Sequence, residues 1–206
     1  MLQAVALSCR RGERRLFSDL NITVESGTLL AVVGENGSGK TSLLRIFSSL
    51  LPPEDGSVRW EGQDIHQLKE LYSAKLMYLG HLNGIKDDLT AVENLMSSMA
   101  LAGEPCSERG AKEALEAIGL KRLVHRLPSK VLSQGQKRRV ALARLWLSTR
   151  PLWLLDEPFT SLDAASTNVV TQRFLMHLQR GGLVVVVTHQ EIALPTERLQ
   201  QLRLTG

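Results

Sequence analysis

The stretch Gly34-Glu35-Asn36-Gly37-Ser38-Gly39-Lys40-Thr41 constrains the fold most, because it needs a strand before it and a helix after it. It matches G-x-x-x-x-G-K-[ST], the phosphate-loop pattern. The apolar residues 29–33 predict a buried strand, and residues 42–47 have helical spacing. The alternative, a glycine-rich turn beside a surface lysine, is disfavoured by this context. The chain is therefore predicted to bind a nucleoside triphosphate.

The residue types of this loop suit phosphate chemistry. Glycines allow positive φ and let backbone N–H groups approach phosphate oxygens, at the positive end of the following helix. Lys40 is expected to reach the β- and γ-phosphates, and the Thr41 hydroxyl to ligate Mg²⁺. The predicted nucleotide-binding residues here are Gly34, Glu35, Asn36, Gly37, Ser38, Gly39, Lys40, Thr41 and Ser42.

A second motif follows the apolar residues 152–155, which suit a strand covered on both faces. Asp156 at its carboxyl end is predicted to hold Mg²⁺. Glu157 follows directly and is free to orient or deprotonate an attacking water. The alternative is a solvated strand end, which the phosphate loop makes less favourable. The two motifs together predict a site for ATP and Mg²⁺, in which Lys40 and Glu157 are catalytic.

A third motif narrows the class of protein. The residues Leu132, Ser133, Gln134, Gly135 and Gln136 precede a basic helical segment at residues 137–144. This motif resembles LSGGQ, the signature of the ATP-binding cassette (ABC) family, with Gln134 replacing the first glycine. The resemblance implies that Ser133 and Gly135 of one copy close over the γ-phosphate held by a second copy. A hydroxyl and a helix N-terminus do make an anion site, although Ser133 as an ordinary N-cap is the simpler alternative.

Other positions extend the resemblance over essentially the whole chain. Ser161, Leu162 and Asp163 match the family's D-loop, which crosses the dimer interface. His189 follows the apolar residues 183–187 and matches the catalytic switch histidine that contacts the γ-phosphate. An isolated histidine is usually a satisfied polar residue, but its place after a buried strand favours the functional interpretation.

Two positions depart from the family pattern. His81 stands where the family has its Q-loop glutamine, and histidine adds a titratable group near the expected Mg²⁺. We hypothesise that coupling to a partner depends on pH there. Arg11 stands where the family often stacks an aromatic ring on adenine. A guanidinium plane can also stack, so loose base selectivity and GTP competition are expected, with Arg11 as a nucleotide-binding residue. Phe17 is an alternative stacking residue, although its position favours the core.

The fold class predicted by the resemblance is α/β. An ABC nucleotide-binding domain has a RecA-like phosphate-loop core, an antiparallel β subdomain and an inserted helical subdomain. Strands are predicted near residues 4–7, 22–24 and 57–60, a turn at 52–56, and helices through 91–147 with boundaries at Ser107 and Gly119. We expect one domain over 1–206, with a core of about 1–80 and 150–206 and a helical subdomain of about 81–149.

Composition fits a single domain of 206 residues with net charge +4. We find no apolar run near the roughly 18 residues of a membrane span, and no signal-peptide pattern at the N-terminus. The two cysteines form no metal or haem motif, which favours a reduced compartment. Basic clusters at 10–15 and 121–126 favour anionic partners without selecting one.

Within the ABC family, residues 78–95 and 141–147, with the segment after Glu157, resemble the ATP-binding subunits of bacterial cytochrome c maturation systems, historically called haem exporters. The resemblance implies a peripheral ATPase at the cytoplasmic face of the bacterial inner membrane. Its expected partners are an integral membrane permease subunit and a second copy in a head-to-tail dimer, with no covalent haem and no direct nucleic acid contact.

Three alternatives remain open at this stage. An ABC ATPase for another cargo, such as a lipoprotein, peptide or ion, would share every motif. An ABC protein of DNA repair or translation would also be basic, but those usually carry two cassettes or long coiled coils. A phosphate-loop kinase or GTPase would lack the signature and the switch histidine.

Overall fold

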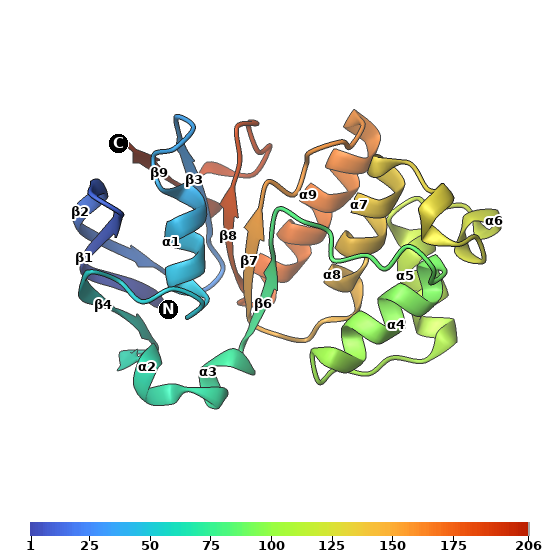
Figure 1. The fold of residues 1–206 in the computed structure, drawn as a ribbon, viewed down its shortest axis with the longest axis horizontal. Helices are drawn as coiled ribbons and strands as arrows, with labels where there is room; N and C mark the ends of the chain where they lie inside the picture. Colours follow the sequence, from blue (N-terminus) through green and yellow to red (C-terminus); the bar gives the residue numbers. More distant parts are fainter. Residues whose placement is uncertain (206) are drawn as a thin grey trace. The chain divides into compact units, whose positions relative to one another are not determined.

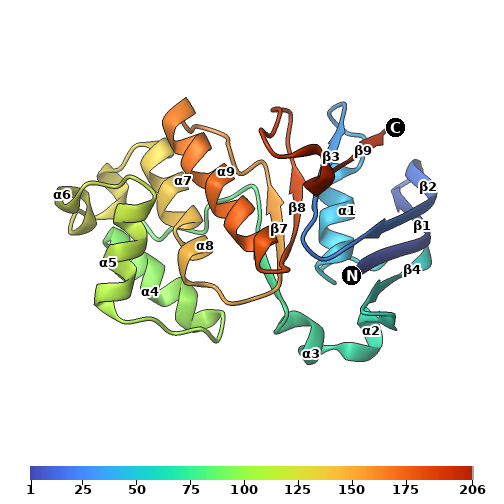
Figure 2. The same cartoon turned by 180° about the vertical axis from the view of Figure 1, so that it is seen from behind.

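The structure, a computed structural model, describes residues 1–205 and divides them into two compact units. The first contains Met1–Tyr78, Arg150–Glu157 and Leu175–Gly206, and the second contains Leu79–Thr149 and Pro158–Phe174. The predicted domain extends to Gly206, which lies outside the described residues. That the two units act as one functional domain stays a prediction. Figures 1 and 2 show the elements of both units.

The first unit is built on two sheets. Its strands are β1 (Leu2–Arg11), β2 (Arg14–Val24), β3 (Leu29–Gly34), β4 (Asp55–Trp60), β5 (Gln63–Asp64), β6 (Leu76–Leu79), β7 (Leu152–Asp156), β8 (Leu183–Val187) and β9 (Leu199–Leu204). One sheet has the order β2-β1-β4-β5 with antiparallel pairs, and the other has the order β6-β7-β8-β3-β9. The strands β7, β8, β3 and β9 pair in parallel. The α/β fold with an antiparallel sheet beside a parallel phosphate-loop sheet is therefore confirmed.

The core of this unit lies between the sheets, around α1 (Lys40–Phe47). Leu43, Leu44 and Phe47 of α1 are fully buried among apolar side chains from both sheets. Every residue of β7 and β8 is buried, which explains their continuous apolar sequences. The burial of β7 and β8, and the pairing of β3 with β8 and β9, fix the carboxyl ends of β3, β7 and β8, from which the phosphate loop, Asp156 and the His189 segment emerge.

The second unit is helical. It contains α4 (Ala91–Leu101), α5 (Glu108–Ala117), α6 (Arg122–His125), the 3-10 turn η1 (Ser129–Val131), α7 (Gln134–Leu142) and α8 (Arg144–Leu147). The helix α9 (Ala164–Gln179) begins in this unit and ends in the first. The boundary predicted at Ser107 is confirmed, because its side chain accepts a hydrogen bond from Gly110 N at 3.1 Å and caps α5. None of the helices within residues 1–205 is long and apolar enough to cross a membrane.

Local hydrogen bonds explain where α4 begins. Thr90 and Glu93 form a capping box, in which the Thr90 hydroxyl accepts from Glu93 N and the Glu93 carboxylate accepts from Thr90 N. The buried Asn94 side chain accepts from Lys86 N at 2.8 Å and donates to Lys86 O at 2.9 Å. These bonds fasten the segment before α4 to the helix itself.

Several sequence-based boundaries need correction. The segment predicted as a turn at 52–56 is shorter, because Asp55 and Gly56 already belong to β4. The basic segment 137–144 is not one helix: α7 runs from Gln134 to Leu142, and α8 begins at Arg144. The strands β6 and β9 were not predicted. Two short helices, α2 (Ile65–Leu68) and α3 (Glu70–Ser73), connect β5 to β6.

Candidate nucleotide site

The phosphate loop joins β3 to α1, with all three of its glycines at positive φ, as predicted. Gly34 has φ 152°, and a Cβ built there would lie 2.4 Å from the Leu204 carbonyl oxygen of β9. Gly39 has φ 99°, and a Cβ there would lie 3.1 Å from Phe17 Cδ1. Any side chain at these positions would clash with its neighbours, so the loop needs glycine for space as well as for conformation.

Inside the loop, Lys40 is 7% exposed, and its Nζ donates to the carbonyl oxygens of Gly34 and Glu35, both at 2.8 Å. These bonds hold the ammonium at the N-terminus of α1, where phosphate oxygens would also be attracted. Ser38 Oγ is buried and has no hydrogen-bond partner among the described residues. A buried hydroxyl without a partner fits a site whose remaining acceptor is an anion.

Asp156 lies at the end of β7 and is 2% exposed. Its Oδ2 accepts a hydrogen bond from Thr41 Oγ1 at 3.0 Å. The structure therefore brings together the two predicted metal ligands, which lie 115 residues apart in sequence. No group of three or more His, Cys, Asp or Glu side chains that could hold a metal occurs within residues 1–205. One hydroxyl and one carboxylate suit Mg²⁺, which takes its other ligands from phosphates and water.

Glu157 and His189 are also neighbours. His189 Nε2 lies 3.3 Å from Glu157 Oε1, and the two side chains are 52% and 21% exposed. Glu157 has φ 50°, an unusual conformation for a residue with a side chain, and its N–H donates to Val187 O at 2.9 Å. The backbone of β8 thus holds the turn that presents the Glu157 carboxylate beside the histidine.

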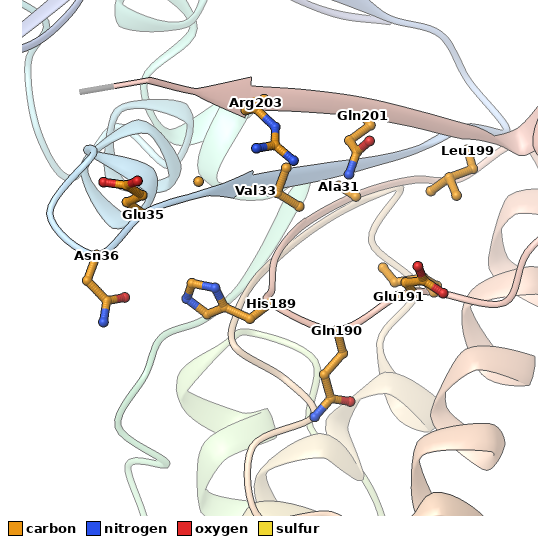
Figure 3. Close-up of a pocket in the computed structure, with 12 residues that line it drawn as sticks. Ala31, Val33, Glu35, Asn36, His189, Gln190, Glu191, Leu199, Gln201 and Arg203 are labelled. Atoms are coloured by element: carbon orange, nitrogen blue, oxygen red, sulfur yellow. The ribbon is translucent and has the colours of Figure 1, made fainter.

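A hollow of about 910 Å³ lies beside His189 (Figure 3). Ala31 and Val33 of β3 and Gln201 and Arg203 of β9 form one side of it. The His189 side chain lies opposite, in the segment after β8. Gly34, Glu35 and Asn36 of the phosphate loop line its edge, whereas Lys40 and Thr41 are not among its lining residues.

Tyr78 lies near Asp156, and the sequence analysis assigned it no role. Burial raises the pKa of Tyr78 above its ordinary value, an effect that a hydrogen bond with Arg45 partly opposes and that the charge of Asp156 reinforces. Tyr78 therefore stays protonated at neutral pH and can act as a neutral hydrogen-bond donor close to Asp156. Tyr78 belongs to the segment that resembles a subgroup of the family, but no role was predicted for it, because only the position of β6 beside β7 places it near Asp156.

The two residues considered for base stacking, Arg11 and Phe17, differ from each other in exposure. Arg11 is exposed at the end of β1. Arg14, across the hairpin, approaches the loop instead, with its Nη1 3.8 Å from a Cβ built at Gly37. Phe17 is 9% exposed and packs against Gly39, in agreement with its assignment to the core. Base stacking by Arg11 stays a prediction.

In the second unit, the signature motif occupies the start of α7. Ser133 is the N-cap, and its hydroxyl accepts from Gln136 N at 3.2 Å. Gln134 is exposed, so replacing the family's glycine creates no clash. Leu132, in contrast, is buried. Gly135 needs to be small, because a Cβ there would lie 2.6 Å from the Ser161 carbonyl oxygen. The signature and the D-loop are therefore in direct contact.

The D-loop residues precede α9. Ser161 has φ 64°, and Leu162 N donates to Phe159 O at 3.1 Å. Asp163 accepts from Ser166 N at 2.7 Å and lies 3.6 Å from Arg139. Hydrogen bonds from Ser166 are the main cause that lowers the pKa of Asp163. The loop is therefore held from both the α7 and α9 sides.

His81 lies in the segment between β6 and α4 and is exposed. Together with residues of α7 and the D-loop, it lines a hollow of about 540 Å³. The described contacts do not join His81 to Asp156 or Thr41 within residues 1–205. Its predicted approach to Mg²⁺ and the pH-dependent coupling both stay predictions.

Comparisons with known proteins agree on one family. The family model described as "ABC transporter" matches residues 17–160. The cytochrome c biogenesis ATP-binding export protein CcmA of Dechloromonas aromatica is 52% identical over 99% of this chain and 100% of its own length. The protein of the same name from Haemophilus influenzae is 46% identical over 97% of this chain and 93% of its own.

Solved structures are similar as well. A putative ABC transporter ATP-binding protein from Pyrococcus furiosus has a TM-score of 0.84 at 25% identity, covering 98% of this chain and 96% of its own. A dimeric bacterial ABC transporter cassette has a TM-score of 0.82 at 25% identity, covering 98% and 94%. The same cassette, as a dimer in a post-hydrolysis state bound to ADP and phosphate, has a TM-score of 0.78 at 25% identity, covering 92% and 88%.

Proposed function

Because this chain belongs to the ABC transporter family, whose ATP-binding subunits hydrolyse ATP, we propose that it powers a membrane complex for cytochrome c maturation. In this proposal, ATP turnover drives haem handling or export, or the release of a haem-loaded chaperone. The observation that carries it is the similarity, at 52% identity over nearly the whole chain, to a cytochrome c biogenesis ATP-binding export protein.

The site residues have distinct roles in this proposal. The phosphate loop binds the ATP phosphates through its N–H groups, and Lys40 neutralises charge on the β- and γ-phosphates. Thr41 and Asp156 would hold Mg²⁺, supported by the 3.0 Å bond that already joins them. When bound, Mg²⁺ would offset the negative charge that develops during phosphoryl transfer. Ser42 lies in the first turn of α1, next to the predicted α-phosphate position.

Glu157 orients the attacking water and accepts its proton. His189 positions the γ-phosphate and keeps the Glu157 carboxylate in place, as their 3.3 Å separation supports. The positive φ of Glu157 supports this role, because so unfavourable a conformation persists only where surrounding bonds, such as the one from Glu157 N to Val187 O, impose it.

Two copies are proposed to dimerise head to tail, and a similar cassette is a dimer in two solved structures. The Ser133 hydroxyl and the N-terminus of α7 in one copy would then face the γ-phosphate bound by the other. Leu132, Gln134, Gly135 and Gln136 shape that surface, and Ser161, Leu162 and Asp163 lie beside it. The support within one chain is the close approach of Gly135 to Ser161.

The integral membrane subunit is proposed to dock at the hollow lined by His81, Leu82 and Asn83. Leu82 is 84% exposed, which suits an apolar contact with a short helix of the partner. Docking there would place the chain peripherally at the cytoplasmic face of the bacterial inner membrane. No direct nucleic acid contact and no covalent haem are part of the proposal.

Complementation of a bacterium that lacks this subunit tests the proposal. Wild type should restore covalent haem on c-type cytochromes, whereas Lys40→Ala and Glu157→Gln should leave haem on the periplasmic chaperone. Glu113→Gln is the matched control, since this glutamate is 70% exposed on α5 and should behave as wild type. Normal cytochrome maturation without the protein would assign it another cargo. Full maturation by both site variants would remove ATP hydrolysis from the mechanism.

A further inference from the structure

Arg138 is a buried cation that none of the predicted roles uses. It lies in the second turn of α7, just after the signature motif, and is only 3% exposed. A charged side chain is rarely buried to this extent unless it is fully hydrogen-bonded, because removing it from water is costly. Its neighbours Lys137 and Arg139 are more exposed, so burial at 138 is a specific feature of this position.

Three acceptors bonded by Arg138 come from two separate segments. Its Nη1 donates to Asn83 Oδ1 at 3.0 Å and to Gly80 O at 3.3 Å. Its Nε donates to Pro158 O at 3.2 Å. A guanidinium presents several donors in one rigid plane, which a lysine ammonium cannot reproduce. One side chain therefore fastens two distant stretches of chain to the signature helix.

Both stretches flank residues of the proposed mechanism. Gly80 directly precedes His81, and Asn83 lines the same hollow as His81, where the membrane subunit is proposed to dock. Pro158 directly follows Glu157, the proposed base. Glu157 itself has φ 50°, a conformation that persists only when surrounding bonds impose it. The Glu157 N–H donates to Val187 O, and Arg138 donates to the carbonyl oxygen of the following residue, Pro158.

We propose that Arg138 is a positioning residue that transmits the position of residues 80–83 to Glu157 through the Pro158 carbonyl. Arg138 touches neither nucleotide nor water in this mechanism. A partner that shifts Asn83 changes the direction of the guanidinium, and with it the turn that presents the Glu157 carboxylate. This inference rests on the proposed function, because it assigns Glu157 as the base.

The test measures kcat and KM for ATP on the full chain carrying Arg138→Gln, Arg138→Lys, Asn83→Ala or Arg138→Gln with Asn83→Ala. Arg173→Gln is the matched control, since Arg173 Nε donates to the Leu145 carbonyl at 2.7 Å. That bond also joins a guanidinium to a backbone carbonyl. We expect Arg138→Gln to lower kcat by roughly ten- to a hundredfold, because small misplacements of a catalytic group cost this much. KM should stay within about twofold, since ATP binding is not touched.

Three relations between variants distinguish positioning from a loss of stability. Arg138→Lys should recover part of kcat, and Asn83→Ala should lower kcat less than Arg138→Gln. Asn83→Ala should have no further effect in the Arg138→Gln background, because its partner is already gone. Likewise, Arg138→Gln should not slow turnover further when Glu157 is replaced by glutamine. Thermal unfolding of each variant, and of Arg173→Gln, verifies that the compared proteins are folded at the assay temperature.

The inference is overturned if Arg138→Gln retains wild-type kcat, or if Arg173→Gln lowers kcat equally. It is also overturned if the effects of Arg138→Gln and Glu157→Gln multiply as independent changes. If Arg138→Gln does not fold, the same relations are measured with Arg138→Lys and Asn83→Ala. Failure of the proposed function gives a different result: Glu157→Gln would then turn over ATP like the wild type, whatever Arg138 does.

Discussion

Gly135 occupies a position in α7 at which the structure leaves no room for a methyl group. A Cβ built there lies 2.6 Å from the Ser161 carbonyl oxygen, well short of the 3.4 Å at which ordinary contacts begin. The Ser161 backbone has little freedom to retreat, because this residue already has φ 64°. Gly135→Ala must therefore displace the D-loop or the first turn of α7.

Two opposing effects determine how much Gly135→Ala changes the free energy of unfolding. Overpacking of this kind costs about 1–3 kcal/mol. Replacing a helical glycine by alanine contributes about 0.5–1 kcal/mol of stability, which partly offsets it. At the midpoints of these two ranges the net loss is about 1 kcal/mol. For a chain near 200 residues this lowers the melting temperature by roughly 2–4 °C.

Gly110 in α5 is the matched control. A Cβ there would lie 3.5 Å from Ser107 Oγ and 3.8 Å from Leu147 Cδ2, both ordinary contacts. Gly110→Ala should therefore raise the melting temperature by about 2 °C through helix propensity alone. Thermal unfolding of both variants by circular dichroism, beside wild type, measures the difference. Equal shifts of the two melting temperatures, in either direction, would refute the packing argument.

ATP turnover is a second measurement that tests the effect of Gly135→Ala. Because Gly135 touches the D-loop, Gly135→Ala should lower ATP turnover at a temperature where the protein is still fully folded. Gly110→Ala should leave turnover unchanged at that temperature. Normal turnover by Gly135→Ala would show that the D-loop accommodates the methyl group without affecting the site.

Three further predictions concern single side chains. Thr41→Val removes the hydroxyl that donates to Asp156. It should raise the Mg²⁺ concentration needed for ATP turnover by roughly tenfold or more, as measured by titrating Mg²⁺. An unchanged Mg²⁺ requirement would show that Thr41 is not a ligand. Asn94→Ala removes the hydrogen bonds to the Lys86 backbone and to the fully buried Ser129 hydroxyl and should cost about 1–3 kcal/mol in urea unfolding, so a loss below about 0.5 kcal/mol would contradict it. Hydrogen bonds from Thr90, the backbone N–H first, lower the pKa of Glu93 below 4.5 in the folded chain. The Glu93 contribution is therefore present above that unfolded value and lost as pH falls through the folded pKa, so Glu93→Gln should flatten the acid-side slope of stability against pH. An identical slope in the variant would argue against the cap.

Local sequence patterns were sufficient for much of the nucleotide site. The phosphate loop, the acidic pair at the end of β7 and the histidine after β8 each follow a run of apolar strand residues. The strand-forming signal and the functional residue are adjacent in such segments, so a short window contains both. The overall fold followed from the order of these motifs and their resemblance to the ABC family, and the comparisons confirm it.

Local patterns did not predict the strand β9 or the burial of Arg138. The strand β9 has the sequence LQQLRL, only one residue of which is buried, and its pairing with β3 depends on a contact more than 160 residues away. Arg138 belongs to a basic run that looks like a solvated helix face. Its burial had one local signal, since Ala141 and Leu142, three and four residues later, lie on the same helix face and are buried.

The sequence alone was sufficient to predict which residues of this chain have phosphate, metal and proton-transfer chemistry, because such residues stand in fixed local patterns beside strand and helix ends. Only the tertiary structure decided which of them meet. The Thr41–Asp156 bond, the Glu157–His189 pair, the approach of Gly135 to Ser161 and the bridge through Arg138 all join residues far apart in sequence. Such contacts depend on strand order and helix packing, which arise from burial of the whole apolar core rather than from any local pattern.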